Sequence, residues 1–326
     1  MYLKDLKFSL WADFIERNYL DSEFRELIEA GIINGATSNP AIFKNAILSS
    51  SAYKEQLSTL SHLSPKEKYE AVAIYDIQKA ADILKPLHDI GDDGYVSIEV
   101  DPYLCDDAKG TVEEGKRLFS QINRKNVMIK VPATDAGYVA MRELVGSGIP
   151  VNATLIFKKE QAISCAEAFR DGVAKNGSKI DTVISVFVSR VDRALDDELL
   201  RGGVDVALSG IYNSADIYAE VEKLRVEGCR TLFASTGVKD DSISPHYYIE
   251  KLLAYNSVNT APVDTIKAFH LNGVKRSALP IPTQIIERHF EKIKSLSIDF
   301  NAVLDKQISD GLKSFKDAFK DILESL

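Results

Sequence analysis

The chain has 326 residues, of which 45% are hydrophobic and 27% charged, with a net charge of −8. This length accommodates either two ordinary domains or one large one, such as a (β/α)8 barrel of ~250 residues with insertions. The acidic balance argues against a general nucleic-acid binder, although a local basic cluster could still hold a small anion. No apolar run approaches the ~18 residues of a membrane span, and the first residues lack the apolar core of a secretory signal. We therefore expect a cytoplasmic protein that binds neither nucleic acid nor membrane.

Cysteine and histidine spacing gives no sign of a metal. Cys105, Cys165 and Cys229 are too far apart in the sequence to suggest a disulfide framework or a metal-binding pair. The histidines have no ligand spacing either and are expected to be ordinary surface or core residues. These are His62, His88, His246, His270 and His289. The sequence predicts no metal site.

Short apolar segments alternate with helical ones along most of the chain. The pattern predicts strands at 8–13, 35–37, 95–100, in the run 127–134, and at 151–156, 183–188, 231–235 and 257–262. Helical spacing is found at 21–30, 53–60, 64–87, 111–122, 135–145, 158–175 and in a charge-rich region that ends near 227. Asn39-Pro40 forces an extended or turn conformation and ends the second strand.

Strands that alternate with helices imply a parallel sheet with right-handed crossovers, and eight of them favour closure into a barrel. The rival fold is an open doubly wound sheet, but no Gly-x-Gly-x-x-Gly follows the first strand. We therefore predict a single (β/α)8 TIM-barrel domain over 1–326. Residues 275–326 would form a C-terminal helical extension packed on the barrel. Its last helix carries an apolar stripe at Ile308, Leu312, Phe315, Phe319, Ile322 and Leu326.

The run 127–134 contains the most informative residue. Val127, Ile129 and Val131 share one parity, and Met128 and Lys130 share the other, so the strand is expected to be covered on both faces. Burial favours the neutral form of an amine, which makes a lysine nitrogen a usable nucleophile near neutral pH. The alternative is an ordinary lysine whose stem packs while its ammonium reaches water.

Polar residues recur at the C-terminal ends of the predicted strands, the face on which such barrels carry their active sites. Any single one could cap a strand or open a loop, whereas the full set indicates a site. The set comprises Asp13, Thr37, Asn39, Glu99, Lys130, Asn152, Thr154, Ser185 and Ser235.

Three members of this set suggest a mechanism. A neutral Lys130 could condense with a ketone to an iminium, an electron sink that lets the adjacent carbon–carbon bond break. Asp13 and Glu99 supply the two carboxylates needed to take the hydroxyl proton and to shuttle protons during imine formation and hydrolysis. A static ion-pair network of the three remains an alternative.

Two cations follow the sixth and seventh predicted strands. Arg190 and Lys239 lie where barrels often bind phosphate, and a guanidinium holds phosphate through two hydrogen bonds. Either could instead be a solvated or structurally paired cation.

These residues, in this order, resemble the transaldolase family of ketose–aldose transferases of the pentose phosphate pathway. The most specific segments are Gly35-Ala36-Thr37-Ser38-Asn39-Pro40, Val96-Ser97-Ile98-Glu99-Val100, Ile129-Lys130-Val131-Pro132-Ala133-Thr134, Asn152-Ala153-Thr154 and Phe233-Ala234-Ser235. The resemblance spans the first to the seventh predicted strand and extends toward the eighth.

The resemblance implies a cofactor-free barrel with the Schiff-base lysine at Lys130. It makes Asp13 the group that deprotonates the C4 hydroxyl of the donor, and Glu99 a proton shuttle that acts through a water. Phe187 matches an aromatic that lines the family's site, and Arg190 with Ser235 would bind the sugar phosphate. The dihydroxyacetone unit and the catalytic water would be held by Thr37, Asn39, Asn152, Thr154 and Ser185.

One departure from the family concerns the phosphate. Many members carry an arginine two residues after the serine of the seventh strand, where this chain has Gly237. Lys239 could supply that charge.

The resemblance implies transfer of dihydroxyacetone from fructose 6-phosphate or sedoheptulose 7-phosphate to erythrose 4-phosphate or glyceraldehyde 3-phosphate. A class I aldolase without an obligatory acceptor is the first alternative. Related small sugar-phosphate aldolases are shorter and carry an amide in place of Glu99, which favours transfer here. A non-catalytic barrel that only binds sugar phosphate is a further alternative. The sequence leaves open whether the protein is a monomer or a homodimer.

Overall fold

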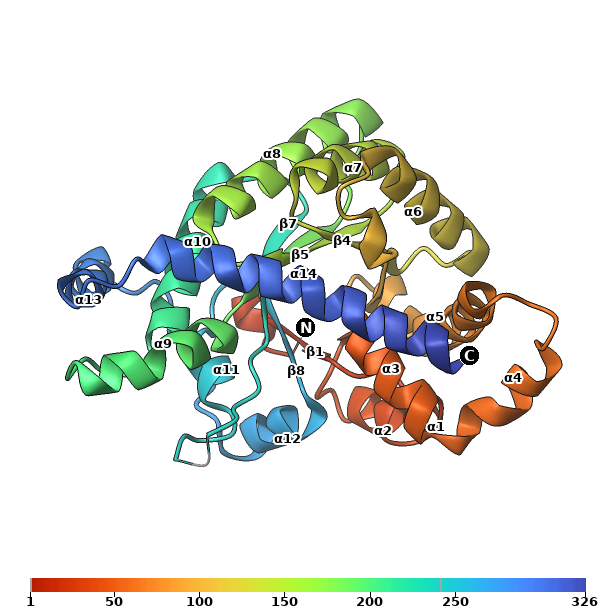
Figure 1. Ribbon diagram of the computed structural model, residues 1–326, viewed down its shortest axis with the longest axis horizontal. Helices are drawn as coiled ribbons and strands as arrows, with labels where there is room; N and C mark the ends of the chain where they lie inside the picture. Colours follow the sequence, from red (N-terminus) through yellow and green to blue (C-terminus); the bar gives the residue numbers. More distant parts are fainter. Residues whose placement is uncertain (1, 241) are drawn as a thin grey trace.

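A closed barrel of parallel strands forms the centre of the computed structural model, which describes residues 2–240 and 242–326 (Figure 1). Every strand pairs in parallel with its neighbours in the sequence, and the last pairs with the first. The strands are β1 Ser9–Ala12, β2 Gly35–Thr37, β3 Tyr95–Glu99, β4 Val127–Pro132, β5 Val151–Ile156, β6 Thr182–Phe187, β7 Cys229–Ala234 and β8 Ser257–Ala261. The predicted fold class is confirmed, and the predicted strand ends differ from these by at most a few residues.

Helices surround the barrel and cross one of its ends (Figure 1). In chain order they are α1 Arg17–Asp21, α2 Glu23–Glu29, α3 Pro40–Ser49, α4 Lys54–Thr59, α5 Pro65–Asp89, α6 Ala108–Ile122, α7 Asp135–Gly146, α8 Lys159–Asn176, α9 Ser189–Arg201, α10 Ser209–Leu224, α11 Tyr247–Lys251, α12 Val263–Asn272, α13 Thr283–Ser295 and α14 Phe300–Ser325. Short 3-10 turns occupy Lys4–Leu6, Ser51–Tyr53 and Pro102–Leu104. Among the described residues, none of these helices is both long and apolar enough to cross a membrane.

Several helices differ from the prediction. The sequence predicts no element directly after Asn39, but α3 begins there at Pro40. Asn39 is extended, with φ −156° and ψ 169°, and its side chain accepts a hydrogen bond from the Ile42 amide at 3.0 Å. Asn-Pro is thus both the end of β2 and the N-cap of a helix, because proline suits the first helical position. The helix predicted at 21–30 corresponds to α2, and α1 is a separate short helix before it. The charge-rich region that ends near 227 forms two helices, α9 and α10, and α11 and α12 are not predicted.

The parity of β4 divides its side chains between two apolar layers. Val127, Ile129 and Val131 belong to the outer layer between strands and helices, while Met128 packs inside the barrel with Trp11. Lys130 shares the parity of Met128 and lies one step closer to the C-terminal end of the strand. Strand parity therefore places the lysine inside the barrel, above an apolar layer.

A buried ion pair occupies the N-terminal end of the barrel. Arg230 contacts Asp93 at 2.7 Å, and the Trp11 indole nitrogen donates to the same carboxylate at 3.1 Å. A β-carbon added at Gly35 would lie 2.5 Å from the Trp11 ring, so only glycine lets the indole pack there. Ion pair and indole are thus hydrogen-bonded to each other at this end, and a hollow of about 530 Å³ opens outside the ion pair.

The last helix lies across the C-terminal face of the barrel (dark blue, Figure 1). Phe315, Phe319 and Ile322 of its predicted stripe are at most 3% exposed. Close packing depends on Gly311, since an added β-carbon would lie 2.9 Å from Cδ2 of Leu155. Leu155 has a φ of +58° at a register irregularity of β5. Because the helix spans the strand ends, it covers one side of the site.

Candidate active site

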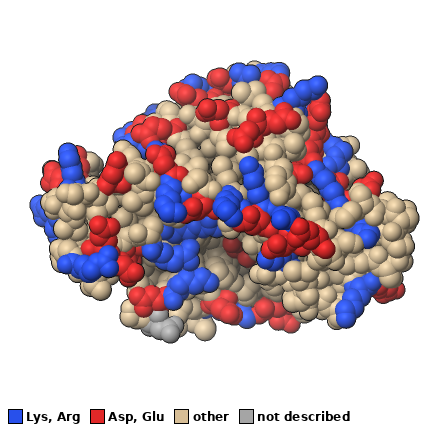
Figure 2. All heavy atoms as spheres, viewed as in Figure 1, with Lys and Arg blue, Asp and Glu red and all other residues tan. Residues whose placement is uncertain are grey.

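A cavity of about 210 Å³ opens at the C-terminal end of the barrel, and we call it the active-site cavity. Figure 2 shows the hollow below α14, with Lys and Arg side chains gathered along one side of it. The predicted site residues that line it are Asp13, Thr37, Asn39, Lys130, Ser185, Phe187, Arg190 and Ser235. Other lining residues escaped prediction, namely Ala41, Ile42, Asn45, Ala234, Thr260, Ser314 and Phe315.

Lys130 lies in the wall of this cavity and is only 5% exposed. Its Nζ donates to the backbone oxygen of Ser38 at 3.1 Å and lies 3.9 Å from Oε2 of Glu99. The register of β3 and β4 sets Glu99 directly opposite Lys130. The nitrogen is thus held by one carbonyl and a distant carboxylate, which leaves room around it for an approaching carbonyl carbon.

Glu99 is 6% exposed, and neither of its carboxylate oxygens has a hydrogen-bond partner among the described residues. Burial raises the pKa of Glu99 to about 7, and the opposing effects of Lys130 and Arg190 are too small to reverse that rise. Asp13 raises it further. A carboxyl with this pKa gains and loses a proton readily near neutrality, as a general acid and base must.

Asp13 directly follows β1 and lines the cavity. Its Oδ1 accepts a hydrogen bond from Thr37 Oγ1 at 2.7 Å, and its backbone amide donates to Ala261 at 2.8 Å. The side chain is partly exposed to the cavity. Asp13 therefore offers a fixed acceptor that a hydroxyl of a bound molecule can reach.

The polar residues of β5 lie deeper than the cavity wall. Asn152 donates to Ser97 at 3.0 Å and accepts from Ser185 at 2.6 Å, and it is fully buried. Thr154 is also buried, and its Oγ1 has no partner among the described residues. Like Glu99, these two residues do not line the cavity. An unpaired buried hydroxyl is costly unless water or a ligand binds it.

Arg190 lies in the first turn of α9 with its guanidinium over the Phe187 ring at 5.0 Å. No carboxylate lies within ion-pair distance of it among the residues described. Burial lowers the pKa of Arg190, and the charge of Arg193 adds to this effect. A half-buried cation without an anionic partner is well suited to bind an anion that enters the cavity.

The loop after β7 lies beside this arginine. Ser235 Oγ is 3.0 Å from Ser189 Oγ and lines the cavity. Lys239 is exposed and does not line the cavity. At Gly237 an added β-carbon would lie 3.0 Å from Cγ of Pro262, a tight contact that requires a small shift of the proline ring.

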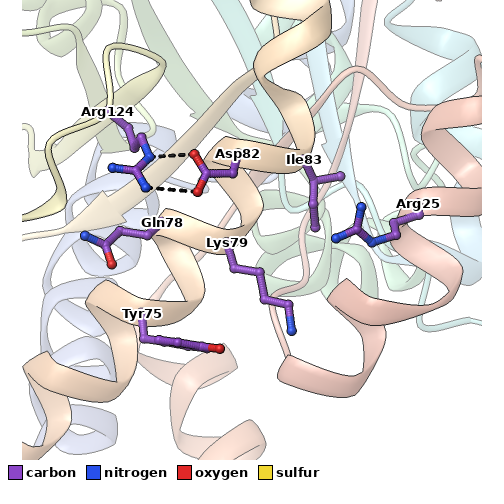
Figure 3. Close-up of a pocket in the computed structure, with 7 residues that line it drawn as sticks. All are labelled: Arg25, Tyr75, Gln78, Lys79, Asp82, Ile83 and Arg124. Carbon is purple, nitrogen blue, oxygen red and sulfur yellow. Dashed lines mark hydrogen bonds and ion pairs between the residues drawn. The ribbon is translucent and has the colours of Figure 1, made fainter.

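Another hollow has none of the candidate catalytic residues. It has a volume of about 380 Å³ and lies on the outside of the barrel at α2, α5 and Arg124 (Figure 3). Asp82 pairs there with Arg124 through two hydrogen bonds of 2.5 and 2.9 Å. It has no residue from a C-terminal strand end. In the described part of the chain, no group of three or more His, Cys, Asp or Glu side chains could hold a metal ion.

Comparison with known proteins decides the family. Residues 10–326 match the model of the family described as transaldolase/fructose-6-phosphate aldolase. The chain is 46% identical to a protein named transaldolase from Campylobacter jejuni (strain RM1221), over 98% of this chain and 99% of the relative. It is 41% identical to a transaldolase from Helicobacter pylori (strain ATCC 700392 / 26695), with the same coverage. The chain belongs to the transaldolase/fructose-6-phosphate aldolase family. It is therefore an enzyme of the transaldolase type.

Within this family fold, Asp192 anchors the helix that carries Arg190. It is 1% exposed, and its Oδ1 accepts from the Gly210 amide at 2.7 Å, which ties α9 to the start of α10. Its Oδ2 has no partner among the described residues. Burial raises the pKa of Asp192 to about 7, and the hydrogen bond from Gly210 offsets only part of this rise.

Asp192→Asn is expected to change how stability depends on pH. Between the ordinary aspartate pKa and about 7, the folded parent holds a proton that the unfolded chain has lost, so its stability falls as pH rises through this window. The asparagine variant keeps the acceptor for Gly210 and has no charge to bury, so its stability should fall less than that of the parent, while Glu99 contributes equally to the fall in both. Urea unfolding at pH 4.5 and pH 8 tests this. An equal fall in the parent and the variant would contradict the assignment.

Proposed function

We propose that the enzyme transfers a dihydroxyacetone unit from a ketose phosphate to an aldose phosphate through a Schiff base on Lys130. Fructose 6-phosphate and sedoheptulose 7-phosphate are the proposed donors, and erythrose 4-phosphate and glyceraldehyde 3-phosphate the acceptors. The observation that carries the proposal is a buried lysine 3.9 Å from a carboxyl whose pKa is about 7, in a cavity with an unpaired arginine. We further propose a cytoplasmic location.

Lys130 and Glu99 would carry out the formation of the Schiff base. The neutral amine attacks the C2 carbonyl of the donor to give a carbinolamine, which loses water to form the iminium. Each step moves a proton, and Glu99 has the pKa to give and accept it. A water held between Glu99 and Thr154 would reach the substrate, since both have buried polar atoms without a partner among the described residues.

Asp13 would act as the base in carbon–carbon cleavage and as the acid in transfer. The carboxylate takes the proton of the C4 hydroxyl, the C3–C4 bond breaks, and its electron pair flows to the iminium to leave an enamine. The shortened aldose phosphate departs. The enamine then attacks the carbonyl of the acceptor, Asp13 returns the proton to the new hydroxyl, and hydrolysis of the iminium frees Lys130.

The remaining polar residues would hold the sugar. Thr37, Asn39 and Ser185 line the cavity and would contact the hydroxyls of the dihydroxyacetone unit. Asn152 would act through its hydrogen bond to Ser185, and Phe187 would close one wall. For the phosphate, Arg190 and Ser235 are the primary ligands. Lys239 or Arg193 would add the second positive charge, because neither has an ion-pair partner among the described residues.

A class I aldolase is the second candidate, and the family description itself includes fructose-6-phosphate aldolase. It would release dihydroxyacetone by protonating the enamine instead of passing it to an acceptor. Helix α14 covers part of the cavity, and burial raises the pKa of Glu99, so both observations indicate a site with little water. Such a site favours transfer, because exclusion of water protects the enamine. A non-catalytic sugar-phosphate binder would not need a buried lysine.

Lys130→Ala is expected to lower transfer from fructose 6-phosphate to erythrose 4-phosphate roughly 10³-fold or more, because the covalent step is lost. Lys125→Ala is the matched control, since Lys125 is an exposed lysine that precedes the same strand. Circular dichroism should show both variants folded. Substantial activity in a folded Lys130→Ala enzyme would refute the Schiff-base assignment. If the parent, without erythrose 4-phosphate, released dihydroxyacetone as fast as it transfers it in the presence of this acceptor, the aldolase would be favoured.

Arg190→Ala is expected to raise KM for fructose 6-phosphate by about 10- to 100-fold while fructose, which lacks the phosphate, is used as by the parent. Arg201→Ala at the exposed end of the same helix is the control. Arg193→Ala and Lys239→Ala, compared in the same assay, identify the second cation by the larger rise in KM. Equal effects on fructose and fructose 6-phosphate would contradict phosphate binding by Arg190.

A further inference from the structure

A chain of hydroxyl groups leads from the eighth strand to Asp13. Thr260 is 3% exposed, lies near the end of β8 and lines the active-site cavity. Its Oγ1 is 2.6 Å from Thr37 Oγ1, and Thr37 Oγ1 is 2.7 Å from Asp13 Oδ1. Strand β1 lies between β2 and β8, so one residue from each of three adjacent strands enters this chain.

The direction of each bond follows from the chemistry of the groups. A threonine hydroxyl has one proton to donate and can also accept, whereas an ionised carboxylate only accepts. When Asp13 is ionised, the Thr37 proton points to Asp13, and Thr260 must therefore be the donor of the 2.6 Å bond to Thr37. When Asp13 has taken a proton, the chain can reverse, with Asp13 donating to Thr37 and Thr37 donating to Thr260.

We propose that Thr260 is a positioning residue that acts through Thr37 on Asp13 and keeps that side chain hydrogen-bonded in both of its protonation states. The inference rests on the proposed function, in which Asp13 takes the proton of the donor's C4 hydroxyl as the C3–C4 electron pair moves to the iminium. Reversal of the two hydroxyls accommodates that proton without moving a heavy atom. The return of the proton to the new hydroxyl restores the first direction.

Backbone contacts fix the position of Thr260 independently of its hydroxyl. Its carbonyl oxygen accepts from Thr236 Oγ1 at 2.9 Å, and the next carbonyl, that of Ala261, accepts from the Asp13 amide at 2.8 Å. Thr236 is fully buried. Valine has the shape of threonine and suits a strand, so Thr260→Val should fold and lose only the hydroxyl.

The experiment compares Thr260→Val with Thr260→Ser, which keeps the hydroxyl, in the full-length enzyme. Borohydride trapping with dihydroxyacetone reports iminium formation without carbon–carbon cleavage, and kcat for transfer from fructose 6-phosphate to erythrose 4-phosphate includes cleavage. Thr260→Val should be trapped as fast as the parent, while its kcat falls about tenfold. Its pH profile of kcat should differ from that of the parent, because the hydroxyl chain that supports both protonation states of Asp13 is interrupted. Thr260→Ser should stay within about twofold of the parent in kcat.

Two results would overturn the inference. One is a Thr260→Val enzyme with the kcat and pH profile of the parent. The other is an equal loss of trapping and transfer that serine does not rescue, which would assign Thr260 a role in folding alone. Failure of the parent itself to form an adduct or to transfer would be a different result, since it would remove the proposed function on which the inference rests.

Discussion

The rest of the structure depends on the contact between Lys130 and Glu99, because two buried ionisable groups must be held close together. Two ionisable groups are almost completely buried at the ends of adjacent strands, with 3.9 Å between Nζ and Oε2. Burial raises the pKa of Glu99 to about 7, because the long contact with Lys130 offsets only part of the cost of burying a carboxylate. A carboxyl that exchanges its proton near neutrality beside a lysine is the arrangement that Schiff-base chemistry requires.

The rest of the barrel maintains this arrangement. Apolar side chains such as Trp11 and Met128 pack inside the barrel below the lysine, and Lys130 itself lines the cavity at the C-terminal face. Strand register sets Glu99 opposite Lys130. Across the mouth, α14 packs closely enough over β5 to leave a small cavity, because residue 311 is glycine. A low-dielectric, shaped site at the strand ends is what allows a few polar groups to control the chemistry.

The fold was predictable from the sequence because strand parity and helical spacing are local signals. Residues such as Lys130 and Glu99 were located by one rule, that polar residues at C-terminal strand ends converge. The same rule applies to Thr260, but β8 has little apolar alternation, so its sequence does not show which of its side chains face the site. Helix α3 was missed because Asn39-Pro40 both ends a strand and begins a helix.

The site residues that the sequence did not predict are brought to the cavity by long-range packing. Ser314 and Phe315 line the cavity only because α14 lies across the barrel, and no local pattern places a C-terminal helix over strand ends. The surroundings of Arg190 also depend on tertiary contacts. Phe187 lies under its guanidinium, and Lys239 does not line the cavity although its place after the seventh strand suggested a phosphate contact.

The central claim, a covalent intermediate on Lys130, is tested most directly by borohydride reduction in the presence of fructose 6-phosphate, followed by peptide mass spectrometry. The account predicts a reduced three-carbon adduct on Lys130 and on no other lysine. An adduct on a different lysine would contradict the map of the site. The absence of any adduct on the folded enzyme at saturating sugar would contradict Schiff-base chemistry altogether.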